Sequence, residues 1–254
     1  MAELLAEGYR RLFKGKRFYI VMGVIAAIAV MFTVLYKFIN SMSGGIGNTS
    51  GIRMPADPLL FDAIGILPLL IGIAAGMLIV QDFKNNTIRN KVIIGHSRVK
   101  IYLANWIVSV TVMIIYMAVY LVVAAALGGI ILGFEEFPTK EMTVNLVHFF
   151  FIELAMTSLI VFLCNTMKNT GGFVLAITMH YIVDMFSLAL MLLNKHPKVQ
   201  EIVSEAVPSL QMNIVQQGYN ESHDHSMRMI LFMVIITVVS TIGGALLFKK
   251  SDLK

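Results

Sequence analysis

The amino-acid sequence predicts an all-α, polytopic membrane protein with six transmembrane helices. Three observations support this fold class. Apolar residues make up 57% of the 254 positions and charged residues only 14%, the mean hydropathy is +0.79, and the apolar residues gather in runs long enough to cross a bilayer. Because backbone polar groups in lipid must be satisfied within their own segment, each run is expected to be a helix.

The predicted spans divide one transmembrane domain, residues 1–254, into regular segments. They cover residues 18–39, 59–81, 101–133, 143–167, 169–194 and 229–248. The third run is longer than a bilayer requires, so we expect that helix to tilt or to project beyond the membrane.

The basic residues predict the orientation. Most of the 20 lysines and arginines lie in four segments, 1–17, 82–100, 165–170 and 249–254. With six spans, these four segments all lie on the same side of the membrane. Lys and Arg accumulate on the cytoplasmic side, so both termini are predicted to be cytoplasmic. The net charge of +5 is explained by this topology and does not indicate a nucleic-acid partner.

The N-terminal segment, 1–17, is predicted to carry a cytoplasmic amphipathic helix. Within residues 3–14, one helical face gathers Leu5, Tyr9, Leu12 and Phe13. Glu7 and Arg11 are four residues apart and can pair. We expect this helix to lie on the inner membrane surface before the first span.

The longest connecting segment, 195–228, is predicted to be a large extracellular loop. It contains an apolar helical face formed by Val199, Ile202, Val203 and Ala206, after which Pro208 ends the helix. We expect this second amphipathic helix to rest on the outer leaflet.

The segment 82–100 is unusually basic for a chain this apolar. It reads DFKNNTIRNKVIIGHSRVK. Asp82 can cap a short helix that continues to about Val92, and Gly95 is placed to end it. A cytoplasmic loop that only fixes topology would account for these charges.

Motifs for soluble catalysis are absent. The sequence contains no GxxxxGK[ST], HExxH, GxSxG or CxxC, and its single cysteine, Cys164, rules out an internal disulfide. His223 and His225 flank Asp224, and we interpret this run as a hydrated loop rather than a zinc site. No metal or other cofactor is predicted in this chain.

Three ionisable residues fall near the middle of the predicted spans. Glu153 lies in the fourth span, and His180 and Asp184 lie one turn apart in the fifth. An acid at this depth is costly and should face protein or water. Three interpretations remain open: a packing cluster, a polar patch in a translocation path, or a site for metal or proton transfer that also uses His148.

The loop sequence resembles that of ABC-2 type permeases, the membrane subunits of a class of ABC exporters, here the type V exporter-like fold. In the bacterial peptide-export and antimicrobial-peptide-resistance branch, the loop between spans two and three reads as an acid, an aromatic, GTIRN and then GxSR. The matching residues are Asp82, Phe83, Thr87, Ile88, Arg89, Asn90, Gly95, Ser97 and Arg98. Asn86 stands where glycine is common, and asparagine tolerates the left-handed turn better than most residues. The ending FKKSDLK, 248–254, is similar to the basic tail of that branch.

The resemblance implies a function for the loop. Residues 82–100 would form a coupling helix that sits in a cleft of a separate ABC ATPase, through Asp82, Phe83, Lys84, Thr87, Ile88, Arg89, Asn90 and Lys91. Phe83 and Ile88 would fill an apolar notch, and Lys84, Arg89 and Lys91 would meet acids.

The resemblance also implies the partners. Two ATPase subunits, carrying ATP and Mg²⁺, would join two permease chains, identical or related, in the bacterial cytoplasmic membrane. The substrate would be an amphipathic or antimicrobial peptide, for which Glu153, His180 and Asp184 are candidate path residues.

Two other functions compete with export. One is an intramembrane metal-dependent hydrolase built from His148, Glu153, His180 and Asp184. The other is a membrane sensor or partner subunit that binds through residues 82–100 without transporting anything.

Overall fold

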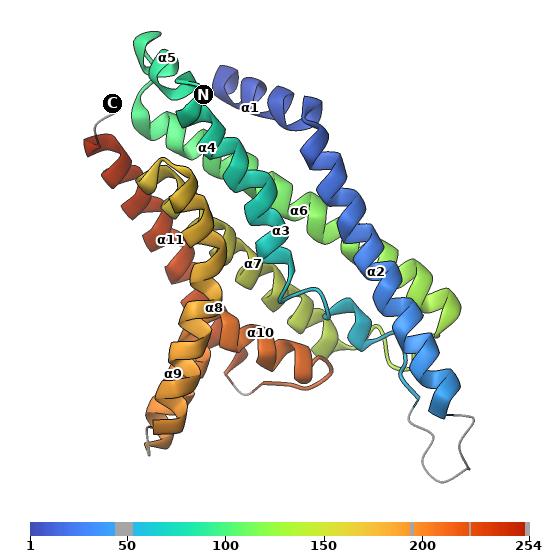
Figure 1. Cartoon of the computed structure of the whole chain (residues 1–254). Helices are drawn as coiled ribbons and strands as arrows, with labels where there is room; N and C mark the ends of the chain where they lie inside the picture. The colour runs from blue at the N-terminus through green and yellow to red at the C-terminus, as the bar shows by residue number, and fades with distance from the viewer. Residues whose placement is uncertain (44–52, 194–195, 224, 252–254) are drawn as a thin grey trace.

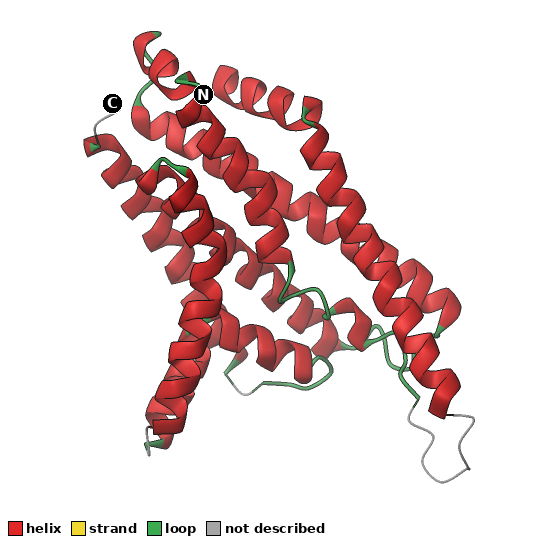
Figure 2. Ribbon diagram, in the orientation of Figure 1, coloured by secondary structure: helices red, strands yellow, loops and turns green. Residues whose placement is uncertain are grey.

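The fold is a bundle of long helices with short helices at both ends (Figure 1). The computed structural model describes residues 1–43, 53–193, 196–223 and 225–251, without the side chains at positions 43, 170, 176, 177, 180, 184 and 190–193. The described residues contain helices and loops and no strand (Figure 2). The all-α prediction is confirmed.

Five helices within the described residues are long and apolar enough to cross a membrane. They comprise most of α2 (Lys16–Ser43), the run from α3 (Leu67–Ile71) through a π-helix (Gly72–Gly76) to α4 (Met77–Lys84), α6 (Arg98–Ile131), α7 (Lys140–Met167) and α11 (Ser226–Lys250). The remaining predicted span, 169–194, corresponds to α8 (Thr170–Leu193), a helix of 24 residues. Because α8 includes positions outside the description, the total of six spans stays a prediction.

The predicted start of the second span at residue 59 is wrong. Regular α-helix begins at Leu67, after a 3-10 turn at Pro58–Leu60 and a series of further turns. Pro68 lies in the first turn of α3, where its missing N–H costs no hydrogen bond. The apolar residues before it, including Phe61 and Ile64, are fully buried in the core. Residues 59–66 are therefore apolar because they are buried against other helices, and not because they form part of a membrane-spanning helix.

The longest described helix, α6, has 34 residues. It contacts the start of α2 and, farther along, the 3-10 turn at Pro58–Leu60. Its Tyr116 hydroxyl donates to the Phe18 carbonyl at 3.0 Å, and its Tyr120 hydroxyl donates to the Leu59 carbonyl at 2.7 Å. The prediction of an overlong third span is confirmed in length.

Asp57 closes the end of the bundle where α6 meets α7. Its carboxylate accepts the backbone N–H groups of Glu135, Glu136 and Phe137 at 2.9, 3.2 and 2.7 Å. The side chain is buried, and it fixes the connection between the two helices against the segment that precedes the 3-10 turn at Pro58–Leu60.

Residues 196–223, the described part of the predicted loop before α11, contain two helices instead of the one predicted. α9 (Pro197–Ala206) ends before Pro208 as expected, but Pro208 also begins α10 (Pro208–Gln217). Met212 and Val215 of α10 lie in the main core. A proline can end one helix, and it can also occupy the first turn of a following helix. The sequence pattern around Pro208 does not show whether a second helix follows.

The N-terminal helix, α1 (Ala2–Lys14), turns into α2 at Gly15. It packs closely on α6: a Cβ at Gly8 would lie 2.8 Å from Val108 Cγ2, and Tyr9 hydrogen-bonds Thr111 at 2.9 Å. Leu4 and Leu12 are its buried residues, whereas Phe13 is exposed. The predicted amphipathic helix is present, and part of its apolar face is covered by protein.

Both chain ends and α5 (Thr87–Ile93) lie at the same end of the bundle, and α9 and α10 lie toward the other (Figure 1). At the first end, the Arg98 side chain donates to the backbone carbonyls of Lys249, at 3.3 Å, and Ser251. The start of α6 is thereby tied to the end of α11.

Candidate functional site

The segment 82–100 is a helix–turn–helix connection rather than one capped helix. α4 ends at Lys84, Asn86 adopts a left-handed conformation with φ of 55°, and α5 begins at Thr87. The left-handed turn anticipated for Asn86 is therefore present. Gly95, with φ of 102°, follows α5, as its predicted role at the helix end requires.

Asp82 does not cap this helix, which corrects the prediction. It lies in the last two turns of α4, fully buried, and its carboxylate binds cations from two other helices. Arg11 of α1 donates to both carboxylate oxygens, to Oδ2 at 2.7 Å. Lys91 of α5 donates to Oδ2 at 3.3 Å. Asp82 thus joins α1, α4 and α5.

Glu7 completes this cluster, called here the Asp82 network: Glu7, Arg11, Asp82 and Lys91. The Glu7 carboxylate lies 3.8 Å from Arg11 Nε and 3.4 Å from Lys91 Nζ. The predicted pair of Glu7 with Arg11 is confirmed. Burial lowers the pKa of Arg11, and Glu7 opposes that shift. Burial, followed by repulsion from Arg11, lowers the pKa of Lys91. Two acids therefore offset the cost of desolvating two cations.

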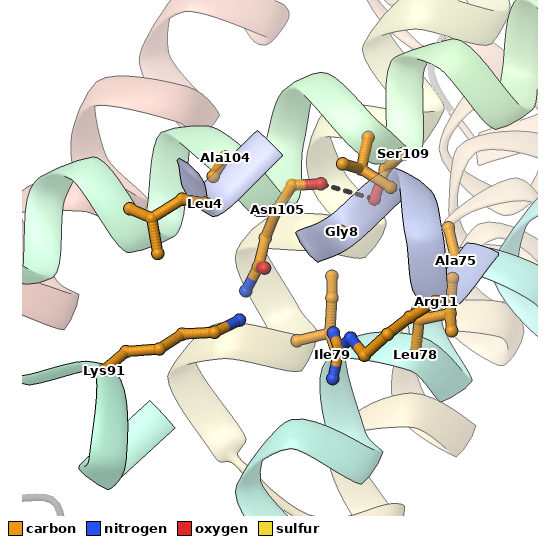
Figure 3. Close-up of a pocket in the computed structure, with 11 residues that line it drawn as sticks. Leu4, Gly8, Arg11, Ala75, Leu78, Ile79, Lys91, Ala104, Asn105 and Ser109 are labelled. Atoms are coloured by element: carbon orange, nitrogen blue, oxygen red, sulfur yellow. Dashed lines mark hydrogen bonds between the residues drawn. The ribbon is translucent and has the colours of Figure 1, made fainter. Parts of the chain in front are cut away.

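A small cavity of about 20 Å³ lies beside the network, between α1, α4, α5 and α6. Figure 3 shows Lys91, Arg11 and Asn105 directed into it from different helices. Its volume suits a single water molecule. Asn105 also donates to Asn165 Oδ1 of α7 at 3.2 Å, so a polar contact between α6 and α7 lies beside the cavity.

The outward side of this region presents a different set of residues. Ile93 and Ile94 are 73% and 77% exposed, and Lys84, Arg89 and Asn90 are also exposed. Lys168, at the end of α7, helps to line a cavity of about 140 Å³ together with Phe83, Lys84, Asn86 and Arg89. We name Lys84, Arg89, Asn90, Ile93, Ile94 and Lys168 the α5 surface.

The predicted coupling residues therefore separate into two groups. Lys84, Arg89 and Asn90 face outward, whereas Asp82, Ile88 and Lys91 are buried within the chain. Phe83 and Thr87 are partly buried, and the Phe83 ring packs edge-on against Phe248 with centroids 6.0 Å apart. Neither Ile88 nor Lys91 is available to a partner in this conformation.

Sequence reasoning missed the apolar part of the α5 surface. Ile93 and Ile94 stand directly before Gly95 in an otherwise basic segment, and an apolar pair at a helix end followed by glycine was the available signal. Lys168 was recognised only as a topological charge, because its position beside α5 depends on the packing of α7.

The candidate path residues are placed only in part. Glu153 of α7 is fully buried, and neither of its carboxyl oxygens has a hydrogen-bond partner within the described residues. His148 hydrogen-bonds Gln211 of α10 at 2.7 Å. The side chains of His180 and Asp184 lie outside the described residues, so their predicted convergence with Glu153 stays a prediction.

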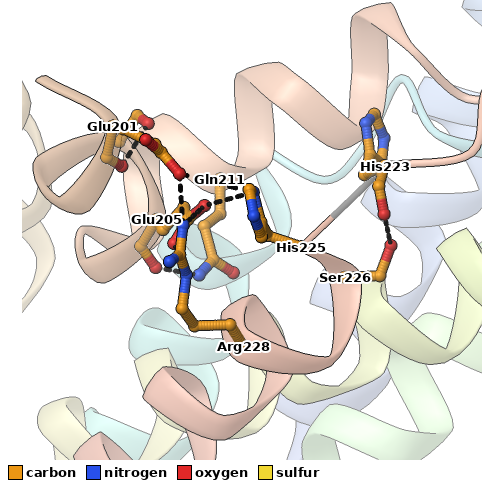
Figure 4. A network of polar contacts seen from close by, with 8 residues as sticks. Glu201, Glu205, Gln211, His223, His225, Ser226 and Arg228 are labelled. Atoms are coloured by element: carbon orange, nitrogen blue, oxygen red, sulfur yellow. Dashed lines mark hydrogen bonds and ion pairs between the residues drawn. The ribbon is translucent and has the colours of Figure 1, made fainter. Parts of the chain in front are cut away.

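A second polar cluster joins α9 to α11 (Figure 4). Arg228 donates to both oxygens of Glu205 and, at 2.5 Å, to Glu201 Oε1. His225 Nδ1 lies 3.4 Å from a carboxylate oxygen of each acid. Glu201, Glu205 and His225 are close enough together to hold a metal ion, but both carboxylates already bind the Arg228 guanidinium. The prediction that His223 and His225 lie in a simple hydrated loop missed this contact.

Replacing Arg228 with glutamine is expected to loosen α9 and to lower the free energy of unfolding, because the two carboxylates lose a shared charged donor. Glu205 is buried and would lose its charged donor. Faster hydrogen exchange across residues 197–206 would report this, with the exposed Lys198→Gln as control. Equal exchange in both variants would contradict the prediction.

The same contact predicts a pH dependence. The hydrogen bond from Arg228 lowers the pKa of Glu201 below its ordinary value of 4.5. A lowered acid pKa contributes stability that is present at neutral pH and lost as the pH falls through the folded-state value. Wild type should therefore lose protection of residues 197–206 at acid pH, and Arg228→Gln should show a weaker dependence.

Comparison with known proteins supports the sequence resemblance. The family described as ABC-2 family transporter protein matches residues 12–187, which include α2 to α7 and the α5 surface. A comparison with curated proteins gives no match. The matched region covers more than half of the chain and includes the segment whose motif first suggested the family. The chain belongs to the ABC-2 family of transporter membrane proteins.

Proposed function

We propose that this chain is the permease subunit of an ABC exporter and that the α5 surface docks on a separate ATPase subunit. The observation that carries the proposal is the exposure of Ile93 and Ile94 beside Lys84, Arg89 and Lys168 at one end of a membrane bundle. An exposed apolar pair in the same connection as the exposed Lys84 and Arg89 suits a partner cleft with an apolar centre and acidic edges.

The Asp82 network gives this surface a rigid connection to the spans. α5 carries Lys91, α4 carries Asp82 and α1 carries Arg11, so a push on α5 moves the ends of three helices together. α4 continues from a π-helix at Gly72–Gly76, an irregular turn that often marks functional positions within a helix. We propose that ATP-driven closure of the ATPases tilts α4 and α6 relative to α7, which alternates access across the membrane.

The proposed topology has six spans, with α8 as the remaining one, and both termini in the cytoplasm. It is supported by the common location of the two chain ends and α5 and by the basic residues that accumulate there. The proposed assembly contains two permease chains in a bacterial cytoplasmic membrane, and two ATPase subunits that carry ATP and Mg²⁺.

The proposed substrate is an amphipathic or antimicrobial peptide, and Glu153, His180 and Asp184 are the proposed path residues. Glu153 supports this assignment because it is a buried acid that has no hydrogen-bond partner within the described residues, and an intramembrane acid of this kind is by default a functional-site candidate. A cationic substrate would suit an acidic side chain at this position.

Co-purification tests the docking proposal. The chain is expressed with a candidate ABC ATPase subunit from the same genome, and wild type is compared with Ile93→Ser/Ile94→Ser and with Arg89→Glu. We expect wild type to retain the ATPase and both variants to bind it at least about tenfold more weakly, since central apolar anchors typically contribute more than 1 kcal/mol each.

The matched control is Lys14→Glu, an exposed basic residue of α1 that lies outside the α5 surface. It should bind the ATPase as wild type does. Unaltered thiol labelling of the buried Cys164 would show that each variant is folded. If wild type retains no ATPase, or if all variants bind equally, the docking proposal is wrong.

A further inference from the structure

An amphipathic cavity of about 340 Å³ lies where α1 turns into α2 and faces α4. Figure 1 shows this elbow at the same end of the bundle as α5 and the termini. The cavity is separate from the α5 surface and shares only Arg11 with the Asp82 network. Its volume falls within the range of small-molecule sites.

The charge of this cavity is positive. Lys16, Arg17 and Arg11 line it, and no Asp or Glu does. Arg11 is already bound to Asp82. Within the part of the chain that is described, Lys16 and Arg17 form no ion pair, so two cations remain for a ligand.

The start of α2 adds to this positive potential. Lys16 and Arg17 are its first two residues, and the helix extends for 28 residues. The first N–H groups of a helix lack partners within it, and the helix dipole there favours an anion. The C-terminal end of α1, at Lys14, lies directly beside the start of α2 and offsets part of this dipole, so the side chains of Lys16 and Arg17 are the main source of positive charge.

The opposite wall changes from apolar to polar along one helical face. Ala74, Leu78, Gln81 and Asn85 all line the cavity and recur at intervals of three or four residues. At the helical rise they extend over about 16 Å. Leu78 and Ala74, with Phe18 of α2, form the inner, apolar part. Gln81 and Asn85 lie toward the end of α4, beside the basic residues.

We propose that this cavity binds a phosphate-bearing anion, with the headgroup between Lys16, Arg17 and Asn85 and an apolar chain along Leu78 and Ala74. This arrangement of charge and apolar surface matches an anionic phospholipid at the edge of a bilayer. A free phosphate ester offers the same headgroup chemistry without the chain, so the test must separate the two sources.

The test uses the purified full chain in detergent, without the ATPase, so its result is independent of the proposed function. Binding of phosphatidylglycerol, phosphatidylcholine and glycerol phosphate is measured by native mass spectrometry. We expect wild type to prefer phosphatidylglycerol to phosphatidylcholine, and Lys16→Ala/Arg17→Ala to bind phosphatidylglycerol roughly 30-fold more weakly, as two lost basic contacts predict.

A matched control separates this cavity from general surface charge. Lys249→Ala/Lys250→Ala removes two basic residues from the end of α11, at the same end of the bundle but outside the cavity. It should bind phosphatidylglycerol within about twofold of wild type. Asn85→Glu, a change at an exposed position, adds a negative charge to the proposed headgroup site and should weaken binding without altering the fold.

Each outcome decides the proposal. Glycerol phosphate that competes as well as the intact lipid would identify a free anion as the ligand, and glycerol phosphate that fails to compete would identify the lipid. Equal affinity for the two lipids, or equal losses in the two double variants, would overturn the assignment of an anion site to this cavity.

Discussion

Replacing Asp82 with alanine is expected to lower the free energy of unfolding by about 3–5 kcal/mol, the usual cost of removing one partner from a buried ion pair. Arg11 and Lys91 would keep their charges in a partly desolvated environment with only the half-exposed Glu7 to offset them. The packing of α1 and α5 on the bundle should loosen together, because both bind the same carboxylate.

The protein contains a natural probe for this loosening. Cys164, its single cysteine, is buried in a packed cluster that also holds Leu4 of α1 and Ile88 of α5. Thiol labelling should be slow in wild type and at least tenfold faster in Asp82→Ala. A labelling rate equal to that of wild type would show that the network does not hold these helices in place.

A triple variant separates the two possible causes of the loss. Arg11→Met/Asp82→Leu/Lys91→Met removes three of the four charges and leaves only Glu7, whose half-exposed carboxylate can be solvated. Replacing a buried ion cluster with apolar residues is often close to neutral. We expect it to recover most of the stability lost in Asp82→Ala. If export needs the network to transmit motion from α5 to the spans, the triple variant should still export more slowly than wild type.

Replacing Glu153 with methionine is expected to have the opposite sign and to raise the free energy of unfolding by roughly 2–3 kcal/mol. Glu153 is fully buried in α7 and both carboxyl oxygens lack partners within the described residues. Methionine has a similar length and no polar atom to desolvate. Thermal unfolding in detergent measures the change, and Thr157→Val, at a buried position whose hydroxyl also has no partner within the described residues, is compared with it to separate the effect of the acid from that of a smaller neutral group.

Measuring peptide export by the Glu153→Met variant tests whether Glu153 lies in the substrate path. A protein that becomes more stable while it loses export would place Glu153 in the proposed substrate path, since functional sites are often maintained at a cost in stability. A variant that is less stable than wild type would contradict the prediction, because it would mean that the acid contributes to packing.

The presence of the long apolar helices could be predicted because it depends on local apolar runs. The start of the second one could not, since residues 59–66 are apolar for a different reason: they are mostly buried in the core. The left-handed turn at Asn86 could also be predicted, because it depends on a single residue type. The role of Asp82 could not be predicted, since Arg11 is 71 positions away. Nothing in the periodicity of the loop distinguishes the buried Ile88 from the exposed Ile93 and Ile94. Which face of a short helix is covered depends on its neighbours, and the neighbours depend on the whole fold.

The length of α6 has a mechanical consequence. At the helical rise its 34 residues extend over about 51 Å, well beyond the roughly 30 Å hydrocarbon layer of a membrane. It begins only a few residues after Ile94, and its Tyr120 hydroxyl is fastened to the Leu59 carbonyl farther along the bundle. In the proposed mechanism, a small rotation imposed on the first turn of α6 becomes a larger sideways displacement at the far end of this long helix. Residues 95–97 connect α6 to the α5 surface, and lengthening this connection with flexible residues should leave the proposed docking intact while weakening the transmission of motion to α6.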